Sequence, residues 1–485
     1  MMAVMTSAAR RDPAFEMDAL RPLQNRLVCE TELAGRRGWA VDVGYGKTLA
    51  AMVVIRWSPA EHVLWCGPKN AAQVAFPAEV AKWRVIDPES VYVLTSEDFN
   101  RAARYDFDGR RTGVGFEDKK ATKARILALA ARYRVLVCTY DWLDALAEVL
   151  GATRLFDLVV WDEAQYLKRG GRQGSQRFKA ANHLGKGARQ MIALSATPQT
   201  ASWEELWALA FLVDHGARLG TTLTEFRDRY MTPDRNGFTY GIRDEIAEAL
   251  VRSEFAQLWT GVRAEERLEL PELTVVDHWV PVPAEAHRAA SKLMRGLLAQ
   301  LDGTTVLPAN VAAGLEKALQ MIQGFGYVAE GETRRTVKVH DEKFEALAEL
   351  LDSGITGGIL LFYRHHATRE KLTKMLGARM RLVTEQGAIA GWQAGEFQIL
   401  AGHPASMSEG LNLQHAGNTI IFFGVPWSLN HYIQAVGRMH RSGQDKPVFV
   451  HRILADHPVE RAVVQSLEGN GALLDILKLT LGDAS

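Results

Sequence analysis

The stretch Leu158-Val159-Val160-Trp161-Asp162-Glu163-Ala164-Gln165 joins a short apolar run to two adjacent carboxylates. An unbroken apolar run of this length is typical of a strand that is buried on both faces of a parallel sheet. Ligands of parallel sheets bind at the carboxyl ends of the strands, so both carboxylates are expected at a binding crevice. Asp162 suits a contact with Mg²⁺, usually through water, and Glu163 suits polarisation of an attacking water molecule. The alternative is a solvated acidic turn.

Short apolar runs of the same kind alternate with helix-like segments along the whole chain. This alternation predicts an α/β fold built on parallel sheets. In the first half the candidate strands are residues 63–66, 135–139, 158–161 and 191–194, and in the second half they are residues 359–363, 398–401, 419–423 and 448–454. Two such sets predict two sheets in tandem rather than one very wide sheet.

The two predicted sheets are joined near Leu270-Pro271-Glu272-Leu273, where prolines interrupt the pattern. We therefore expect one domain over residues 1–270 and a second domain over residues 271–485. Over about residues 284–335 the sequence turns helical, most clearly between Ala284 and Gln323. This pattern predicts a helical insertion before the second sheet.

A glycine-rich turn, Gly44-Tyr45-Gly46-Lys47-Thr48, stands near the beginning of the chain. In such a turn, backbone N–H groups surround phosphate oxygens at the N-terminus of a helix. Lys47 is expected to neutralise the β- and γ-phosphates of a nucleotide, and the Thr48 hydroxyl is expected to hold Mg²⁺. Val41 stands where a phosphate loop usually has its first glycine, and an accidental turn is the alternative.

Two further stretches carry groups that suit the same chemistry. Leu194-Ser195-Ala196-Thr197-Pro198 ends another candidate strand, and its hydroxyls could sense a γ-phosphate, although a plain exit from the strand is the alternative. Gln434-Ala435-Val436-Gly437-Arg438-Met439-His440-Arg441-Ser442-Gly443-Gln444 carries two arginines far from the glycine-rich turn. Phosphoryl transfer needs positive charge at the equatorial oxygens, which an arginine from a second domain can supply. A surface ion pair is the alternative for these arginines.

Taken in order, these elements resemble the Swi2/Snf2 group of superfamily 2 helicases, from about Leu20 to about Leu454. The resemblance implies two RecA-like lobes with ATP and Mg²⁺ between them. It implies that ATP is bound by Gln24 (the adenine reader, in Leu20-Arg21-Pro22-Leu23-Gln24), Gly44, Gly46, Lys47 and Thr48, and that Mg²⁺ is held by Thr48 and Asp162. The residues implied in catalysis are Lys47, Asp162, Glu163, Gln434, Arg438 and Arg441, with the last two as arginine fingers.

Nucleic-acid contacts are expected from a basic segment and from family motifs. Between Ala164 and Trp203 the chain has no acidic residue and seven basic ones, so it can neutralise backbone phosphates without reading sequence. A solvated surface is the alternative for this segment. The resemblance adds Pro68-Lys69, Thr139-Tyr140 and Gly410-Leu411-Asn412-Leu413. The residues expected at DNA are Lys69, Thr139, Lys168, Arg169, Arg172, Ser175, Lys179 and Asn412.

The chain departs from the family pattern just before Asn412. Ala405, Met407 and Ser408 stand where the family usually has a lysine and two glycines. Glu409 adds negative charge where a DNA backbone would pass, although Asn412 itself is retained.

Composition sets limits on these interpretations. Lys plus Arg and Asp plus Glu both number 57 among 485 residues, so no global positive charge marks a nucleic-acid-binding protein. The cysteines, Cys29, Cys66 and Cys138, show no paired spacing, which argues against a disulfide framework or zinc site and suits a reducing cytosol. We see no secretory signal and no apolar run long enough to span a membrane, so we expect a cytoplasmic protein without a membrane partner.

We expect a DNA-dependent ATPase that tracks along double-stranded DNA through its phosphate backbone. The short form, with His403-Pro404 and Pro426-Trp427-Ser428-Leu429 before the last two motifs, resembles versions carried by bacteriophages, which implies a bacterial host cytoplasm. A strand-separating helicase shares every motif, although the sequence offers no candidate wedge element. An ATP-controlled module that remodels another protein, for example RNA polymerase, is the alternative from a different class.

Overall fold

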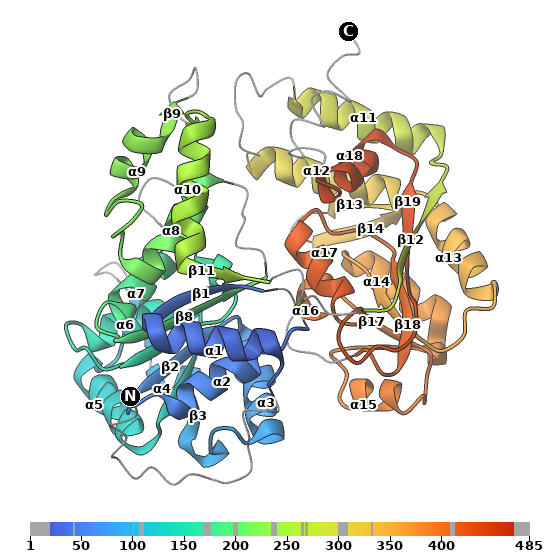
Figure 1. Cartoon of the computed structure of the whole chain (residues 1–485). Helices are drawn as coiled ribbons and strands as arrows, with labels where there is room; N and C mark the ends of the chain where they lie inside the picture. The colour runs from blue at the N-terminus through green and yellow to red at the C-terminus, as the bar shows by residue number, and fades with distance from the viewer. Residues whose placement is uncertain are drawn as a thin grey trace. The chain divides into compact units, whose positions relative to one another are not determined.

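The chain forms two compact units in its computed structural model (Figure 1). The structure describes residues 20–41, 44–99, 101–105, 111–167, 176–196, 202–233, 240–262, 266, 270–298, 309–330, 333–407 and 413–469. Unit 1 comprises Met1–Asp234 and Tyr240–Arg267, and unit 2 comprises Arg235–Thr239 and Leu268–Ser485. Among the described residues, no helix is both long enough and apolar enough to cross a lipid bilayer.

Unit 1 is built around a seven-stranded sheet in which all neighbouring strands are parallel. Its strands are β1 (Arg36–Ala40), β2 (Val63–Gly67), β3 (Val91–Val93), β6 (Val135–Thr139), β7 (Leu158–Trp161), β8 (Gln190–Ser195) and β11 (Trp259–Gly261). The order across the sheet is β11-β1-β8-β7-β2-β6-β3. Every residue of β2, β6 and β7 is buried, because these central strands are covered on both faces.

Helices cover both faces of this sheet, and each face has its own hydrophobic core. The first core lies under α1 (Pro22–Ala34), α2 (Lys47–Trp57) and α3 (Phe76–Trp83), and the second lies under α5 (Lys119–Arg132), α6 (Leu143–Leu150), α7 (Gln176–Gly185), α8 (Trp203–Asp214) and α10 (Glu245–Leu258). Trp65 belongs to the first core and Cys66 to the second, since successive side chains of a strand alternate between faces.

The remaining elements of unit 1 are short. They are α4 (Ser96–Phe99), α9 (Leu223–Tyr230), the hairpin of β4 (Arg101–Tyr105) and β5 (Arg111–Phe116), the hairpin of β9 (Met231–Pro233) and β10 (Tyr240–Ile242), and the single turns η2 (Ala71–Ala75), η3 (Pro88–Ser90) and η4 (Ala164–Leu167). The turn η4 matters most for the site, because it directly follows β7 and the two expected carboxylates.

Unit 2 contains a second, six-stranded parallel sheet of order β12-β19-β18-β15-β17-β16. Its strands are β12 (Leu273–Val280), β15 (Gly358–Phe362), β16 (Met380–Leu382), β17 (Ile399–Gly402), β18 (Gly417–Phe422) and β19 (Val448–Ala455). The associated helices are α13 (Glu342–Asp352), α14 (His366–Leu376), η6 (Gly377–Arg379), α15 (Ala388–Gln393), α16 (Pro404–Met407), α17 (Leu429–Val436) and α18 (Pro458–Leu467).

An insertion follows β12 and precedes the other strands of the second sheet. It consists of α11 (Ala284–Leu298), α12 (Ala309–Ile322) and an antiparallel hairpin of β13 (Phe325–Glu330) and β14 (Thr333–Lys338). Buried residues of α11, α12 and α18 form a small core of their own, including Met294, Leu319 and Ala462. The segment expected to be helical over about 284–335 is thus helical only as far as Ile322, and its last part is the hairpin.

The predicted α/β fold with two parallel sheets is confirmed. The strands expected at residues 135–139 and 158–161 coincide with β6 and β7, and the other predicted strands differ from the observed ones by at most two residues at either end. Strands β1, β3, β11, β12 and β16 were not predicted.

Candidate active site

The glycine-rich turn leads from β1 into α2, and two left-handed glycines shape it. Gly44 and Gly46 have φ angles of 93° and 75°, which residues with a side chain rarely adopt. A Cβ atom on Gly46 would also lie 2.3 Å from Nε2 of Gln24, so a larger residue there would displace the Gln24 side chain. Gly46 is the N-cap of α2, and no described side chain caps the first turn of that helix. The helix N–H groups can therefore face an anion, which fits a phosphate loop.

Gln24 joins this turn to α1. Its side chain is only 4% exposed, and its Nε2 donates a 3.1 Å hydrogen bond to the carbonyl oxygen of Gly46. Its Oε1 accepts a 2.9 Å hydrogen bond from the backbone N–H of Arg21. The residue expected to read adenine therefore lies directly beside the turn expected to hold the phosphates.

Lys47 begins α2, and its Nζ donates a 2.5 Å hydrogen bond to the carbonyl oxygen of Val41. Val41 is fully buried, and its N–H donates a 3.0 Å hydrogen bond to the carbonyl oxygen of Ser195 at the end of β8. The valine that replaces the usual first glycine thus holds the start of the loop against the sheet. Thr48 follows in the first turn of α2 and is half-buried. Residues 42–43 lie outside the described residues.

The two expected carboxylates directly follow β7. The backbone of Asp162 is held on both sides: its N–H donates a 2.7 Å hydrogen bond to Cys66, and its carbonyl accepts a 2.7 Å hydrogen bond from the Tyr140 hydroxyl. A Cβ atom on Gly67 of the neighbouring strand would lie 3.2 Å from the Asp162 Cβ, so the glycine permits this close approach. Glu163 has a φ of 53°, in the left-handed region. Such backbone strain is concentrated at functional sites in proteins.

Side-chain hydrogen bonds link the ends of β7 and β8. The side-chain amide of Gln165 donates to the carboxylate of Glu163, and its Oε1 accepts a 2.8 Å hydrogen bond from the Ser195 hydroxyl. Gln165 is 7% exposed and Ser195 is fully buried, so their polar atoms depend on these partners. The carboxylate expected to polarise water is thereby tied to the strand end expected to sense a γ-phosphate. Thr197 and Pro198 of that strand end lie outside the described residues.

The two arginines of the late motif lie in a turn that follows α17. Gln434 in that helix is 1% exposed, Arg438 is 5% exposed and Arg441 is half-buried. The backbone carbonyl of Arg438 accepts a 3.3 Å hydrogen bond from the N–H of Leu413. These residues therefore belong to the packed part of unit 2 rather than to a loose surface loop.

Gln444, at the end of the same motif, connects this turn to the sheet through hydrogen bonds. Nε2 of Gln444 donates hydrogen bonds of 2.9 Å to the carbonyl of Gln414 and 3.0 Å to that of Gly417, at the start of β18. The ring of His440 lies 2.8 Å from the carbonyl oxygen of Pro271 through Nε2. Arg441 lies between His440 and Gln444 in the sequence, so the hydrogen bonds of these two residues restrain its backbone.

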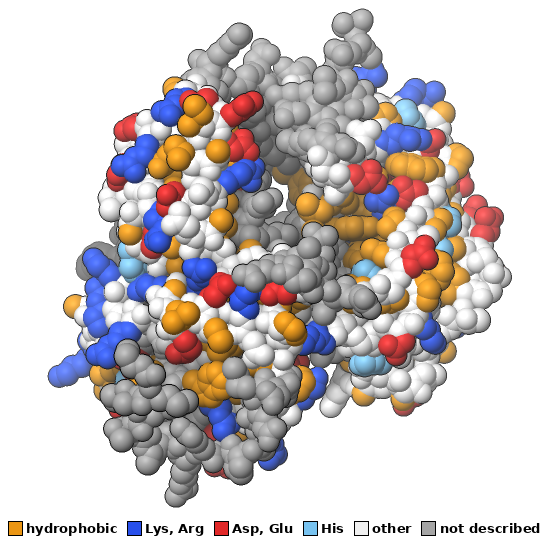
Figure 2. All heavy atoms as spheres, in the orientation of Figure 1, with side chains coloured by type: hydrophobic (Ala, Val, Ile, Leu, Met, Phe, Trp, Pro, Cys, Tyr) orange, Lys and Arg blue, Asp and Glu red, His pale blue; other side chains and the backbone are white. Residues whose placement is uncertain are grey.

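The structure describes only part of the expected nucleic-acid surface. Lys69 is exposed directly after β2, and Lys179 is exposed on α7, whereas Thr139 is 2% exposed at the end of β6 and is much less accessible. Lysine and arginine side chains lie along the side of unit 1 formed by α5, α6 and α7 (Figure 2). The expected residues Lys168, Arg169, Arg172, Ser175 and Asn412, with the neighbouring Ser408 and Glu409, lie outside the described residues.

Three residues of this site stand within the quoted motifs, but the sequence assigned them no role of their own: Tyr140, Gln165 and Gln444. Burial raises the pKa of the Tyr140 hydroxyl well above its ordinary value, so the hydroxyl stays protonated and remains a donor to Asp162. The available signal for Gln165 was an amide two residues after Glu163 in an otherwise apolar turn. No local pattern could identify Gln444, because its acceptors lie about thirty residues earlier in the chain.

Comparison with known families agrees with this geometry. Residues 41–284 match the model of the SNF2-related domain, which covers half of the chain, and residues 342–443 match that of the helicase conserved C-terminal domain. The chain belongs to the SNF2-related family. The resemblance to the Swi2/Snf2 group is therefore confirmed, and the two domains together imply a helicase-like ATPase that uses a nucleotide.

Relatives of this SNF2-related chain include phage and animal proteins. Protein p41 of Acyrthosiphon pisum secondary endosymbiont phage 1 is 26% identical, over 94% of this chain and 97% of its own length. The SWI/SNF-related matrix-associated actin-dependent regulator of chromatin subfamily A-like protein 1 of Xenopus tropicalis is 22% identical, over 87% of this chain but only 41% of its own length. The solved Sulfolobus solfataricus SWI2/SNF2 ATPase core in complex with dsDNA has a TM-score of 0.42 at 20% identity, covering 96% of this chain and 93% of that chain.

Proposed function

We propose that this SNF2-related chain is an ATP-driven translocase that tracks along double-stranded DNA. The proposal rests on two features that lie close together at the carboxyl ends of neighbouring strands of the first sheet. The glycine-rich turn follows β1, and the Glu163–Gln165–Ser195 hydrogen bonds join the ends of the adjacent strands β7 and β8. A phosphate loop beside an oriented carboxylate is the arrangement that nucleotide hydrolysis requires.

In this proposal the turn binds the phosphates and Gln24 reads the adenine. The N–H groups that follow Gly44 and Gly46 donate hydrogen bonds to the phosphate oxygens, and the Lys47 ammonium neutralises their charge. Lys47 must exchange its present acceptor, the Val41 carbonyl, for phosphate oxygens when a nucleotide binds. This exchange replaces a neutral acceptor by a charged one, which strengthens the hydrogen bond.

The second group of residues acts on the γ-phosphate. Thr48 and Asp162 are the residues that would hold Mg²⁺, which supplies charge neutralisation when it is bound. Glu163 would polarise the attacking water molecule, because Gln165 holds its carboxylate in place at the carboxyl end of β7. Gln165 thus acts as a positioning residue for Glu163.

The arginines of unit 2 would complete the reaction. We infer that Arg438 and Arg441 place positive charge at the terminal phosphate, a contribution worth about 10³–10⁵ in rate for arginine fingers. Gln434 would take part beside them. Hydrolysis would then remove the group that both units bind, and an alternating grip on the backbone would move the protein along DNA.

Contacts with DNA would be made through the phosphate backbone. Lys69 and Lys179 are the exposed members of the expected set among the described residues, and Thr139 is a buried member. Lys168, Arg169, Arg172, Ser175 and Asn412 complete the set. Two observations support duplex DNA as the partner: the SNF2-related family itself, and an animal relative that is a regulator of chromatin. The phage relative, which matches nearly the whole chain, supports a place in the cytoplasm of a bacterial host.

Rates of ATP hydrolysis without nucleic acid, with single strands and with duplex test this proposal. We expect duplex DNA to stimulate turnover severalfold and single strands to have a weaker effect. Equal stimulation by both would support a strand-separating helicase instead. Stimulation by neither would support an ATP-controlled module that remodels another protein.

A further inference from the structure

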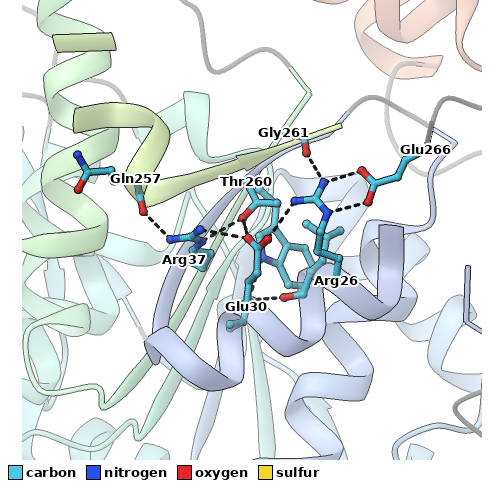
Figure 3. Close-up of polar contacts among 10 residues, drawn as sticks. Arg26, Glu30, Arg37, Gln257, Thr260, Gly261 and Glu266 are labelled. Atoms are coloured by element: carbon cyan, nitrogen blue, oxygen red, sulfur yellow. Dashed lines mark hydrogen bonds and ion pairs between the residues drawn. The ribbon is translucent and has the colours of Figure 1, made fainter. Parts of the chain in front are cut away.

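Arg26 in α1 and Glu266 form a bidentate ion pair where the chain leaves unit 1 (Figure 3). The Nε and Nη2 atoms of Arg26 lie 2.7 and 2.6 Å from the two carboxylate oxygens of Glu266. Nη2 also donates a 2.6 Å hydrogen bond to the carbonyl of Gly261, the last residue of β11. The two side chains are only 16% and 6% exposed, so water screens this pair much less than an ordinary surface ion pair.

Glu30, one helical turn after Arg26, extends these contacts into the sheet. Its carboxylate accepts hydrogen bonds from Arg26, from Arg37 of β1 and from the hydroxyl of Thr260 in β11 (Figure 3). Arg37 in turn donates a 3.0 Å hydrogen bond to the Thr260 hydroxyl. β11 has only three residues, all paired with β1 at the edge of the sheet. Side-chain hydrogen bonds from α1 and β1 therefore help to hold this short edge strand in place.

The same helix also touches the glycine-rich turn. Gln24 donates to the carbonyl of Gly46, and Arg26 stands two residues further along α1, which is about 3 Å along the helix axis. A helix transmits displacement as a rigid body over such a distance. A nucleotide that engages Gln24 and the turn would therefore restrain Arg26 and, through it, Glu266 and Gly261.

We propose that Arg26 and Glu266 are positioning residues that couple nucleotide binding at the glycine-rich turn to the edge strand β11. The inference rests on the proposed function, because it requires a nucleotide at that turn. Nucleotide binding to α1 restrains β11 and Glu266, and release of the nucleotide relaxes them.

Hydrogen exchange of the full chain tests this coupling. Exchange of peptides covering residues 257–270 is measured with and without a non-hydrolysable ATP analogue, whose binding is measured separately. In the parent we expect the analogue to slow exchange about fivefold or more, the lower range of coupling between two sites. Arg26→Ala and Glu266→Gln should bind the analogue nearly as well but lose this slowing. Arg252→Ala, which breaks an exposed Arg–Glu pair on α10, should retain it.

The reciprocal exchange of charges separates coupling from a general loss of structure. Arg26→Glu combined with Glu266→Arg restores the ion pair and should restore part of the slowing that each single change removes. If Arg26→Ala does not fold, Glu266→Gln, which removes only the charge, carries the test. Analogue binding without slowing in the parent, or slowing retained in Arg26→Ala, would overturn the inference alone. A parent that binds no nucleotide would overturn the proposed function.

Discussion

The Ser195 hydroxyl donates a 2.8 Å hydrogen bond to Oε1 of Gln165 and so joins the ends of two adjacent strands of the first sheet. Ser195 is the last residue of β8, and Gln165 lies in the turn η4 that follows β7. Because both side chains are buried, removing either partner leaves a polar atom unsatisfied, at a cost of about 1–3 kcal/mol. The pair keeps the side chain of Gln165 in position to hold the carboxylate of Glu163.

Ser195→Ala should lower the turnover of ATP at saturation by about tenfold while the affinity for ATP stays close to that of the parent, since only the orientation of Glu163 is lost. Steady-state kinetics and nucleotide binding check this. Ser58→Ala is the matched control, because Ser58 donates to Gln190 at the opposite end of β8. Equal losses of turnover in both variants would show that Ser195 contributes only stability.

Glu163→Gln should bind ATP but hydrolyse it about 10²–10⁴ times more slowly, the usual contribution of a positioned proton acceptor. The change keeps the shape of the side chain and removes its charge. Single-turnover hydrolysis with labelled ATP measures the chemical step directly. Glu148→Gln, an exposed carboxylate on α6, serves as the control. Hydrolysis at the parent rate would show that another residue polarises the water.

Arg441→Ala should leave the binding of nucleotide and of DNA nearly intact and reduce hydrolysis by about 10³-fold or more, because an arginine finger acts mainly on charge that develops in the transition state. Binding by fluorescence anisotropy and turnover are measured on the same preparation. Arg381→Ala removes an exposed arginine of unit 2 and should keep full activity. A large loss of nucleotide affinity with normal turnover would contradict the proposed role.

Neutralising Lys168, Arg169 and Arg172 together should weaken DNA binding equally for unrelated duplex sequences. Each lost phosphate contact should reduce the slope of log affinity against log salt concentration by about 0.9. Titrations at several salt concentrations measure that slope. Neutralising Arg229, Arg243 and Arg252, three exposed arginines of unit 1 outside the expected set, provides a control of equal charge. An unchanged slope in the triple variant would show that this segment is an ordinary solvated surface and does not contact DNA.

Unit 2 should lose stability in mild acid because of His457. Burial, together with the neighbouring His287, lowers the pKa of His457 to about 4, while its Nδ1 accepts the hydrogen bond from Val459 that begins α18. The unfolded chain binds the proton more readily, so this stabilisation is complete above about pH 6.5 and is lost as the pH falls towards about 4, up to about 3 kcal/mol.

His457→Asn isolates this effect, since asparagine also caps a helix but does not titrate in this range. Calorimetry at about pH 7 and about pH 5 should show a smaller drop in the unfolding temperature of unit 2 in the variant than in the parent. His366→Asn, at an exposed histidine, is the control. The same drop in the parent and in His457→Asn would exclude His457 as its cause.

The central strands could be predicted because each is a single short run of apolar residues, which is typical of a buried strand. β6 and β7 consist of apolar or small residues that are buried on both faces. β1 could not be predicted, because it begins with Arg36 and Arg37, which are half-buried and find their hydrogen-bond acceptors only in the folded chain. Arg36, for example, donates to the carbonyls of Val213 and Ala188, more than 150 residues away. The edge strand β12 was missed because its burial is partial and irregular.

The sequence by itself determined the two-sheet fold and the residues proposed for the chemistry, because a phosphate turn or a carboxylate after a strand is a local pattern. Only the tertiary structure decided which side chains meet. Gln165 reaches Ser195 because β7 and β8 are neighbours in the sheet, and Arg26 reaches Glu266 because β11 returns to the edge beside β1. Such pairings depend on strand order and on the path of long connections, which local periodicity does not encode.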